Sequence, residues 1–342
     1  MIDWSFALAT GTRLSRPGPE IGASEAAEVV AELREGAALS EEPVRQFADL
    51  HARSATAPVL VVDRPRWIEA NLETFETILE PAMDQISAKA PGPVARAIGS
   101  KVGGAEIGSL MAFMSTKVLG QFDPFWEGPA GETGRLLLVA PNIVHVERQL
   151  EVDPHDFRLW VCLHEETHRV QFTAVPWMRD HLRGLMDDFV ESTDLDPAVV
   201  AAGLGELVKV VRGQSDRSLG DLFQNETQRE VVDRITGVMS LLEGHADVVM
   251  DGVGPDVIAS VAQIRRKFDQ RRQGSGGIDR LIRRLLGLEG KMRQYRDGAV
   301  FVRHAVDTVG LEGFNAVWAS AENLPTRAEI LEPDAWVRRV HA

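Results

Sequence analysis

The feature that most constrains this chain is the pattern H-E-x-x-H, in which His164 and His168 are separated by one helical turn. On an α-helix, residues i and i+4 lie on the same face, so both imidazoles point to one side. Two neutral imidazoles can bind one zinc ion together, and the carboxylate of Glu165 lies beside them as a general base. The helix is itself predicted, because Asp153-Pro154 provides a capping residue followed by proline at the first helical position. The stretch therefore predicts a helix that carries two ligands of a zinc site.

A zinc site of this kind needs a third protein ligand. The stretch from Glu243 to Asp247, on a helix predicted over about 225–250, is similar to the E-x-x-x-D arrangement of gluzincin peptidases. The resemblance implies that Glu243 completes a His-His-Glu site. It also implies that Asp247 accepts a hydrogen bond from a ligating histidine and so fixes the tautomer of that histidine. His245 is the alternative third ligand, since it lies roughly 200° round the helix from Glu243 and the two are not expected to face the metal together.

Charge and cysteine content exclude several classes of function. The chain has 342 residues and a net charge of -14, which argues against nucleic acid or an anionic membrane as the main partner, because phosphate binding needs a basic face. The single cysteine, Cys162, excludes an intramolecular disulfide framework and is expected to be a small buried helix residue.

No secretory signal is visible, so we expect a cytoplasmic protein. The most apolar stretch, 93–119, contains four charged residues and is not expected to span a membrane; its glycines should allow close helix packing. The oligomeric state is left open.

Apolar periodicity predicts a fold that is mainly α-helical with a small β element. We expect residues 1–20 to be irregular, 121–134 to form a loop, 135–140 to form a strand that resumes at 143–146, and 59–62 to be a strand or the lead-in to a helix. Helices are predicted at about 24–36, from 40 onward, and at 66–89, 177–190, 197–212, 225–250, 255–272, 278–295 and 301–309.

The predicted strand at 135–140 precedes the H-E-x-x-H helix. Zincin metallopeptidases place an edge strand there, along which an extended substrate can add by backbone hydrogen bonds. The glycine-rich stretch 273–277 is expected to be a surface loop or a hinge. For the domain organisation we expect a mostly helical region at 1–90 and a catalytic region at 91–342, joined in one compact unit.

Several stretches together resemble a bacterial family of zincin-like metallopeptidases and hydrolases, often labelled as associated with biosynthesis of the deazaflavin coenzyme. They are 118–123, 139–144, the surroundings of His164, 243–247 and 291–295. The resemblance extends from about residue 90 to 310 and less distinctly over the N-terminal part. It implies a zincin-like fold with additional helices, Zn²⁺ as cofactor, and a peptide or small amide as substrate.

The expected mechanism is zinc-assisted hydrolysis of an amide, in which zinc activates water and polarises the carbonyl while Glu165 moves the proton to the leaving amine. Tyr295, the only tyrosine, is the first candidate to stabilise the oxyanion. The alternative is that Tyr295 is a partly buried helix residue with its hydroxyl at the surface. His304 and Arg293 are the next candidates. Glu166, about 100° further round the helix than Glu165, should lie off the metal face. Two alternatives stay open: a zinc-binding scaffold without catalysis that binds a partner, and a non-peptide amidohydrolase that uses the same site.

Overall fold

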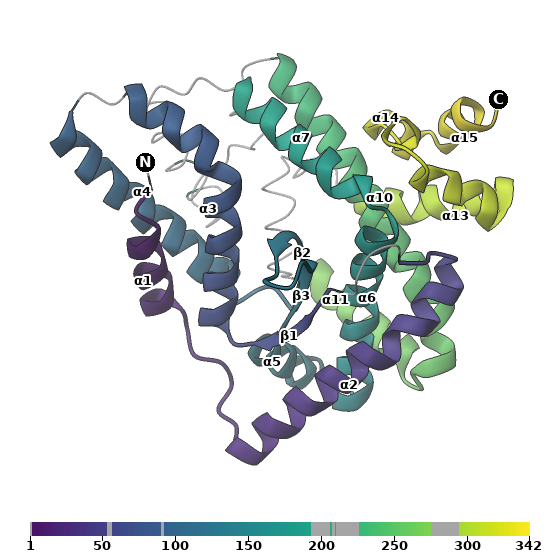
Figure 1. Cartoon of the computed structure of the whole chain (residues 1–342). Coiled ribbons are helices and arrows are strands. Elements are labelled where there is room, and N and C mark those ends of the chain that lie inside the picture. Colours follow the sequence, from purple (N-terminus) through teal and green to yellow (C-terminus); the bar gives the residue numbers. More distant parts are fainter. Residues whose placement is uncertain are drawn as a thin grey trace.

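A small sheet lies at the centre of the computed structural model, which describes residues 2–52, 57–89, 92–192, 206, 209, 226–274 and 294–342 (Figure 1). Its strands β1 (Val59–Val62), β3 (Thr133–Val139) and β2 (Gly120–Glu127) lie in that order. β1 runs parallel to β3, and β2 forms an antiparallel hairpin with β3 that is irregular between Asp123 and Glu127. The mainly α fold with a small β element is therefore confirmed.

The central strand β3 separates two hydrophobic clusters, because successive side chains of a strand point to opposite faces. Leu138 belongs to the larger cluster, which also contains residues of the H-E-x-x-H helix. Leu137 and Val139 belong to the smaller cluster. Burial on both faces explains why this strand reads as an uninterrupted apolar run in the sequence.

Helices cover both faces of the sheet (Figure 1). The smaller cluster is built with α1 (Trp4–Leu14), α3 (Arg64–Lys89) and α4 (Pro93–Met114). The described residues also form the helices α2 (Ala23–Ala48), α5 (Ala140–Leu150), α6 (Pro154–Ala174), α7 (Trp177–Glu191), α10 (Glu226–Val257), α11 (Val261–Gly274), α13 (Gln294–Asn315), the 3-10 turns η1 (Ala316–Trp318) and η2 (Ala321–Asn323), α14 (Arg327–Leu331) and α15 (Pro333–His341). Within the described part of the chain, no helix combines the length and the apolar character that crossing a bilayer requires.

Helix α6 carries the H-E-x-x-H pattern and begins as predicted. The Asp153 side chain accepts a hydrogen bond from the backbone N–H of Asp156, and Pro154 opens the helix. Most of its residues are buried, since α2 and α10 pack against it and strand β2 lies beside it. A helix that is buried on several sides can hold polar side chains in fixed positions, which a metal site needs.

The N-terminal region differs from the prediction in two places. Residues 4–14, expected to be irregular, form helix α1, whose glycine at position 11 lies against α4. A Cβ on Gly108 of α4 would lie 2.3 Å from the Ala7 carbonyl oxygen, so these glycines permit close helix packing, as expected for that stretch. The two helices expected at 24–36 and from 40 are one helix, α2. Gly36 does not end it but makes room for Cys162 of α6, since a Cβ there would lie 3.2 Å from the cysteine sulfur.

The region before α6 differs more strongly. Residues 120–127, expected to be part of a loop, form strand β2. The strand predicted at 135–140 exists, but it is the central strand, and the edge beside α6 belongs to β2. Residues 143–146, expected to resume the strand, lie in helix α5. Pro141 therefore opens a helix rather than breaking a strand, and the apolar residues after it are buried on one helical face.

In the C-terminal half, α7 agrees with the helix predicted at 177–190. The helix predicted at 255–272 begins later than expected. Pro255 lies inside α10 near its end, and the next helix, α11, begins at Val261. Helix α13 extends past the predicted 309 through a kink at Gly310, whose φ is 74°. Most of the predicted helices at 197–212 and 278–295, and most of the glycine-rich stretch 273–277, lie outside the described residues, although 206, 209, 294 and 295 are described as helical.

Candidate metal centre

Helix α6 places the two histidines of the motif with their rings edge to face, 4.9 Å apart between centroids. Their Nε2 atoms lie 3.4 Å from each other. This arrangement follows from the i, i+4 spacing of His164 and His168 on one helical face. Both rings therefore turn the same kind of nitrogen toward one point in space.

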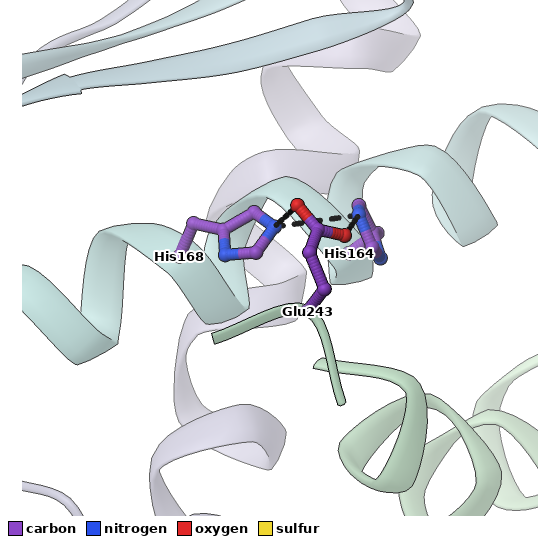
Figure 2. A group of neighbouring side chains, drawn as sticks. All are labelled: His164, His168 and Glu243. Atoms are coloured by element: carbon purple, nitrogen blue, oxygen red, sulfur yellow. Dashed lines mark hydrogen bonds and ion pairs between the residues drawn. The ribbon is translucent and has the colours of Figure 1, made fainter. Parts of the chain in front are cut away.

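The third side chain at this point is Glu243 of α10 (Figure 2). Its Oε2 lies 3.7 Å from Nε2 of His164, and its Oε1 lies 3.6 Å from Nε2 of His168. The next residue, Gly244, lets α10 approach α13 closely, because a Cβ there would lie 2.2 Å from the carbonyl carbon of Gly298. One potential ligand atom from each of these three side chains lies within 4.8 Å of the other two.

The spacing of the three ligand atoms fits a zinc ion. Ligands at about 2.0–2.2 Å from a tetrahedral zinc lie roughly 3.3–3.6 Å from one another. The separations of 3.4, 3.6 and 3.7 Å observed here are close to these edges. Two imidazoles and one carboxylate are also one of the donor sets that catalytic zinc sites use. The side chains are 13–30% exposed, so the centre is open enough to admit water and a substrate.

A buried glutamine, which the sequence analysis missed, holds one of the histidines. Gln171 Oε1 lies 3.0 Å from Nδ1 of His168, so the amide oxygen accepts the Nδ1–H and leaves Nε2 as the free ligand atom. The Gln171 amide nitrogen donates to the Leu242 carbonyl and to Nδ1 of His245, at 3.0 and 2.9 Å. Gln171 is fully buried. Its spacing of three residues from His168 is the signal that could have revealed it, because i and i+3 are neighbours on a helix.

His245, the alternative third ligand, has a different environment. It is buried between Phe314 and Trp318, and its Nδ1 accepts from Gln171. Burial lowers the pKa of His245 to about 3, and the neighbouring His168 adds to this, so the ring is neutral. The structure thus places Glu243 in the three-residue group and His245 behind it, linked to His168 through Gln171.

Glu165 lies between α6 and the edge strand β2. A Cβ on Gly120 would lie 2.4 Å from Cγ of Glu165, so only glycine leaves room for the carboxylate at this point of the strand. Burial, and secondly the nearby Glu243, raise the pKa of the Glu165 carboxyl well above its ordinary value. Within the described ranges, no hydrogen-bond donor or cation pairs with this carboxylate. It is available to exchange a proton.

The other predicted site residues lie in varied surroundings. Asp247 pairs with Arg265 of α11 at 3.6 Å. Asp247 was predicted to accept a hydrogen bond from a ligating histidine, but the acceptor for His168 is Gln171. His304 Nε2 lies 2.7 Å from Asp334 of α15. Tyr295 belongs to α13, but its side chain lies outside the described residues, as does Arg293.

Glu166 and Cys162 lie on faces of α6 away from the ligands. Glu166 is buried, and its two carboxylate oxygens share the Nε–H of Arg169, at 2.8 and 2.9 Å from Nε. Arg169 also pairs with Glu41 of α2. Cys162 is buried against α2, as expected, and burial raises the pKa of its thiol. Cys162 therefore packs directly on α2, and Glu166 holds the Arg169 side chain that pairs with α2.

A solved structure from Chloroflexus aurantiacus, described as "a putative hydrolase with a novel fold", is 30% identical to the chain and superposes with a TM-score of 0.73, covering 100% of this chain and 99% of that one. No curated protein matches. The association with deazaflavin biosynthesis stays a prediction. Residues 2–337 match the zincin-like metallopeptidases, and the chain belongs to this family.

Proposed function

We propose that the chain is a zinc-dependent hydrolase that cleaves an amide bond, with peptides as the substrate class. The observation that carries the proposal is the convergence of His164, His168 and Glu243 at the spacing of zinc ligands. A structural zinc site has four protein ligands, whereas a catalytic one has three and keeps a position for water or substrate. The group of three in the described part of the chain supports the catalytic kind over the scaffold alternative.

When bound, zinc would supply Lewis-acid activation of the attacking water and of the scissile carbonyl. Glu165 follows His164 directly and has no partner among the described residues. Its carboxylate would take the proton of the water and pass it to the leaving amine. Gln171 would hold His168 in the tautomer that presents Nε2.

The edge strand supports a peptide over another amide. β2 lies beside α6 and pairs with β3 on one side. An extended peptide can add to the open edge of such a strand through backbone hydrogen bonds, which bind main chain irrespective of sequence. Because Gly120 of this strand lies against Glu165, a peptide bound there would pass close to the general base.

The test compares zinc-loaded wild type with Glu165→Gln on a library of peptides. The substitution keeps the size of the side chain and removes its basicity. We expect unchanged zinc content and fold with a loss of turnover of at least about 100-fold. Glu312→Gln, on the exposed surface of α13, is the matched control and should cleave like wild type. Equal, chelator-sensitive cleavage by Glu165→Gln would exclude Glu165 as the base, and no cleavage by zinc-loaded wild type would favour the scaffold.

A further inference from the structure

A hollow of about 200 Å³ lies between strand β2 and the junction of α6 with α7. The sheet lines it with Phe122 and Pro124 of β2 and Thr133 of β3. The helical side lines it with Phe172, Thr173, Pro176, Arg179 and Asp180. The rings of Phe122 and Phe172 are stacked with 5.3 Å between centroids. Both are only partly buried, so aromatic surface is exposed in the hollow.

The hollow lies next to the metal centre along both elements that form it. Phe172 follows His168 by four residues, so it lies about 6 Å further along α6 on nearly the same face. On β2, Gly120 lies against Glu165, and Phe122 stacks on Phe172 two residues later. Two residues of extended chain span about 7 Å and place their side chains on the same side. A peptide alongside β2 with its scissile bond near Glu165 would thus place a side chain over the hollow within about two residues.

The size and lining of the hollow select one kind of occupant. A cavity of about 150 Å³ holds a benzene ring, and sites for whole small molecules measure about 300–1,000 Å³. The observed 200 Å³ therefore suits a single large side chain. Stacked phenylalanine rings and two prolines favour an aromatic or large aliphatic group, because apolar surface is removed from water on both partners.

Arg179 adds a polar contact at this place. Its Nη2 pairs with Glu127, whose side chain is 71% exposed, at 2.6 Å. Its Nε is buried and has no hydrogen-bond partner. Buried donors are nearly always paired in folded proteins, so this Nε–H, on a residue that lines the hollow, has the capacity to donate to an acceptor that enters there. A carbonyl or carboxylate oxygen of the substrate would be such an acceptor.

We propose that this hollow is a specificity pocket for the proposed peptidase: it receives an aromatic or leucine-like side chain of the substrate, within about two residues of the scissile bond, while Arg179 binds an adjacent substrate carbonyl or carboxylate. The proposal rests on the proposed function for its role in cleavage but not for the binding of the side chain. The two can therefore be tested apart.

The binding test uses metal-free protein, so it does not depend on zinc or hydrolysis. Saturation-transfer NMR is recorded with N-acetylphenylalaninamide and, as the side-chain control, N-acetylglycinamide. Thr133→Trp should fill the hollow and reduce transfer to the ring protons several-fold, whereas Thr308→Trp, on the exposed surface of α13, should not. Circular dichroism confirms folding, and Phe172→Ala offers a second variant that removes one wall. Equal transfer in wild type, Thr133→Trp and Phe172→Ala overturns the pocket.

The cleavage test profiles a peptide library with zinc-loaded protein. We expect aromatic residues and leucine to exceed glycine roughly 10- to 100-fold in kcat/KM at one position near the scissile bond, with the preference lost in Thr133→Trp. Arg179→Gln should weaken cleavage, while Arg183→Gln, whose guanidinium lies over Phe125 outside the hollow, should not. Cleavage without this preference overturns the proposal even if the ring binds. Ring binding without any cleavage refutes the proposed hydrolase, and the hollow then remains a binding site only.

Discussion

Replacing Gln171 tests whether this buried amide positions the metal ligand His168. In Gln171→Leu, the His168 Nδ1–H loses its acceptor and His245 Nδ1 loses its donor, at contacts that measure 3.0 and 2.9 Å. Each buried group left unpaired costs about 1–3 kcal/mol, so with two such groups we expect the metal-free protein to lose about 2–6 kcal/mol of unfolding free energy. Zinc affinity should fall roughly 10- to 100-fold, as it does when the hydrogen-bond partner of a ligand is removed.

A second variant separates positioning from packing. Gln171→Glu keeps an acceptor for His168, but it removes the two N–H groups that reach Leu242 and His245. It should destabilise the metal-free protein and yet bind zinc at least as tightly as wild type, because a carboxylate acceptor raises the basicity of a ligating imidazole. Gln46→Leu, on the exposed face of α2, is the matched control.

Zinc affinity is measured by competition with a chromogenic chelator, and unfolding free energy by urea titration of metal-free protein. The reasoning predicts two separable effects: the leucine variant loses both quantities, and the glutamate variant loses only stability. Wild-type zinc affinity in Gln171→Leu would refute the positioning role. An equal loss of affinity in both variants would show that the shape of the glutamine matters, and not its acceptor.

Three further perturbations have defined outcomes. Glu243→Gln should release zinc, His245→Gln should retain most of it, and Asp247→Asn should lower zinc affinity roughly 10- to 100-fold. Metal analysis after dialysis checks this. Loss of zinc in His245→Gln together with retention in Glu243→Gln would make His245 the third ligand. Gly120→Ala should displace Glu165, since its Cβ would lie 2.4 Å from Cγ, and should lower turnover at least about tenfold with zinc content unchanged; activity equal to wild type would contradict the close contact. Burial alone would raise the pKa of Glu329, but the hydrogen bonds from Arg339 and Thr326 outweigh it, so the pKa is lowered. The ion pair of Glu329 with Arg339 therefore contributes stability above the pKa that Glu329 has in the unfolded chain. That stability is lost as the pH falls through the pKa of Glu329 in the folded protein. Arg339→Gln should therefore cost about 1–3 kcal/mol in urea unfolding at neutral pH and much less below about pH 3, and a cost independent of pH would contradict the ionic reading.

Local patterns in the sequence were sufficient for the parts of the site that lie within one helix. The spacing of His164 and His168 requires a shared face in any α-helix, and the Asp153 cap with Pro154 specifies where that helix begins. The approximate ranges of α3, α6 and α7 follow from apolar periodicity for the same reason. Glu243 was assigned by resemblance, and the structure places it beside the histidines.

The errors concern residues whose role depends on a distant partner. Gly36 favours a helix end by its intrinsic propensity, yet α2 continues through it, and the absence of a Cβ there lets α2 approach the sulfur of Cys162 closely. Residues 120–127 form a strand because they pair with β3, although Pro124 and the following turn suggest a loop. Glu166 lies off the metal face, as predicted, but the sequence did not reveal that it is buried in an ion pair with Arg169.

The sequence by itself determined the helical class of the protein and the pair of histidines, because both depend on spacing within a few residues. The strand that borders the motif helix and the side chain that holds His168 follow from tertiary packing, and so does the hollow proposed to receive a substrate side chain. The contact of Gln171 with His245 joins residues 74 positions apart, and the stack of Phe122 on Phe172 joins a strand to a helix. Such contacts arise from the packing of α6 against α10 and β2, and no periodicity within a single segment encodes that packing.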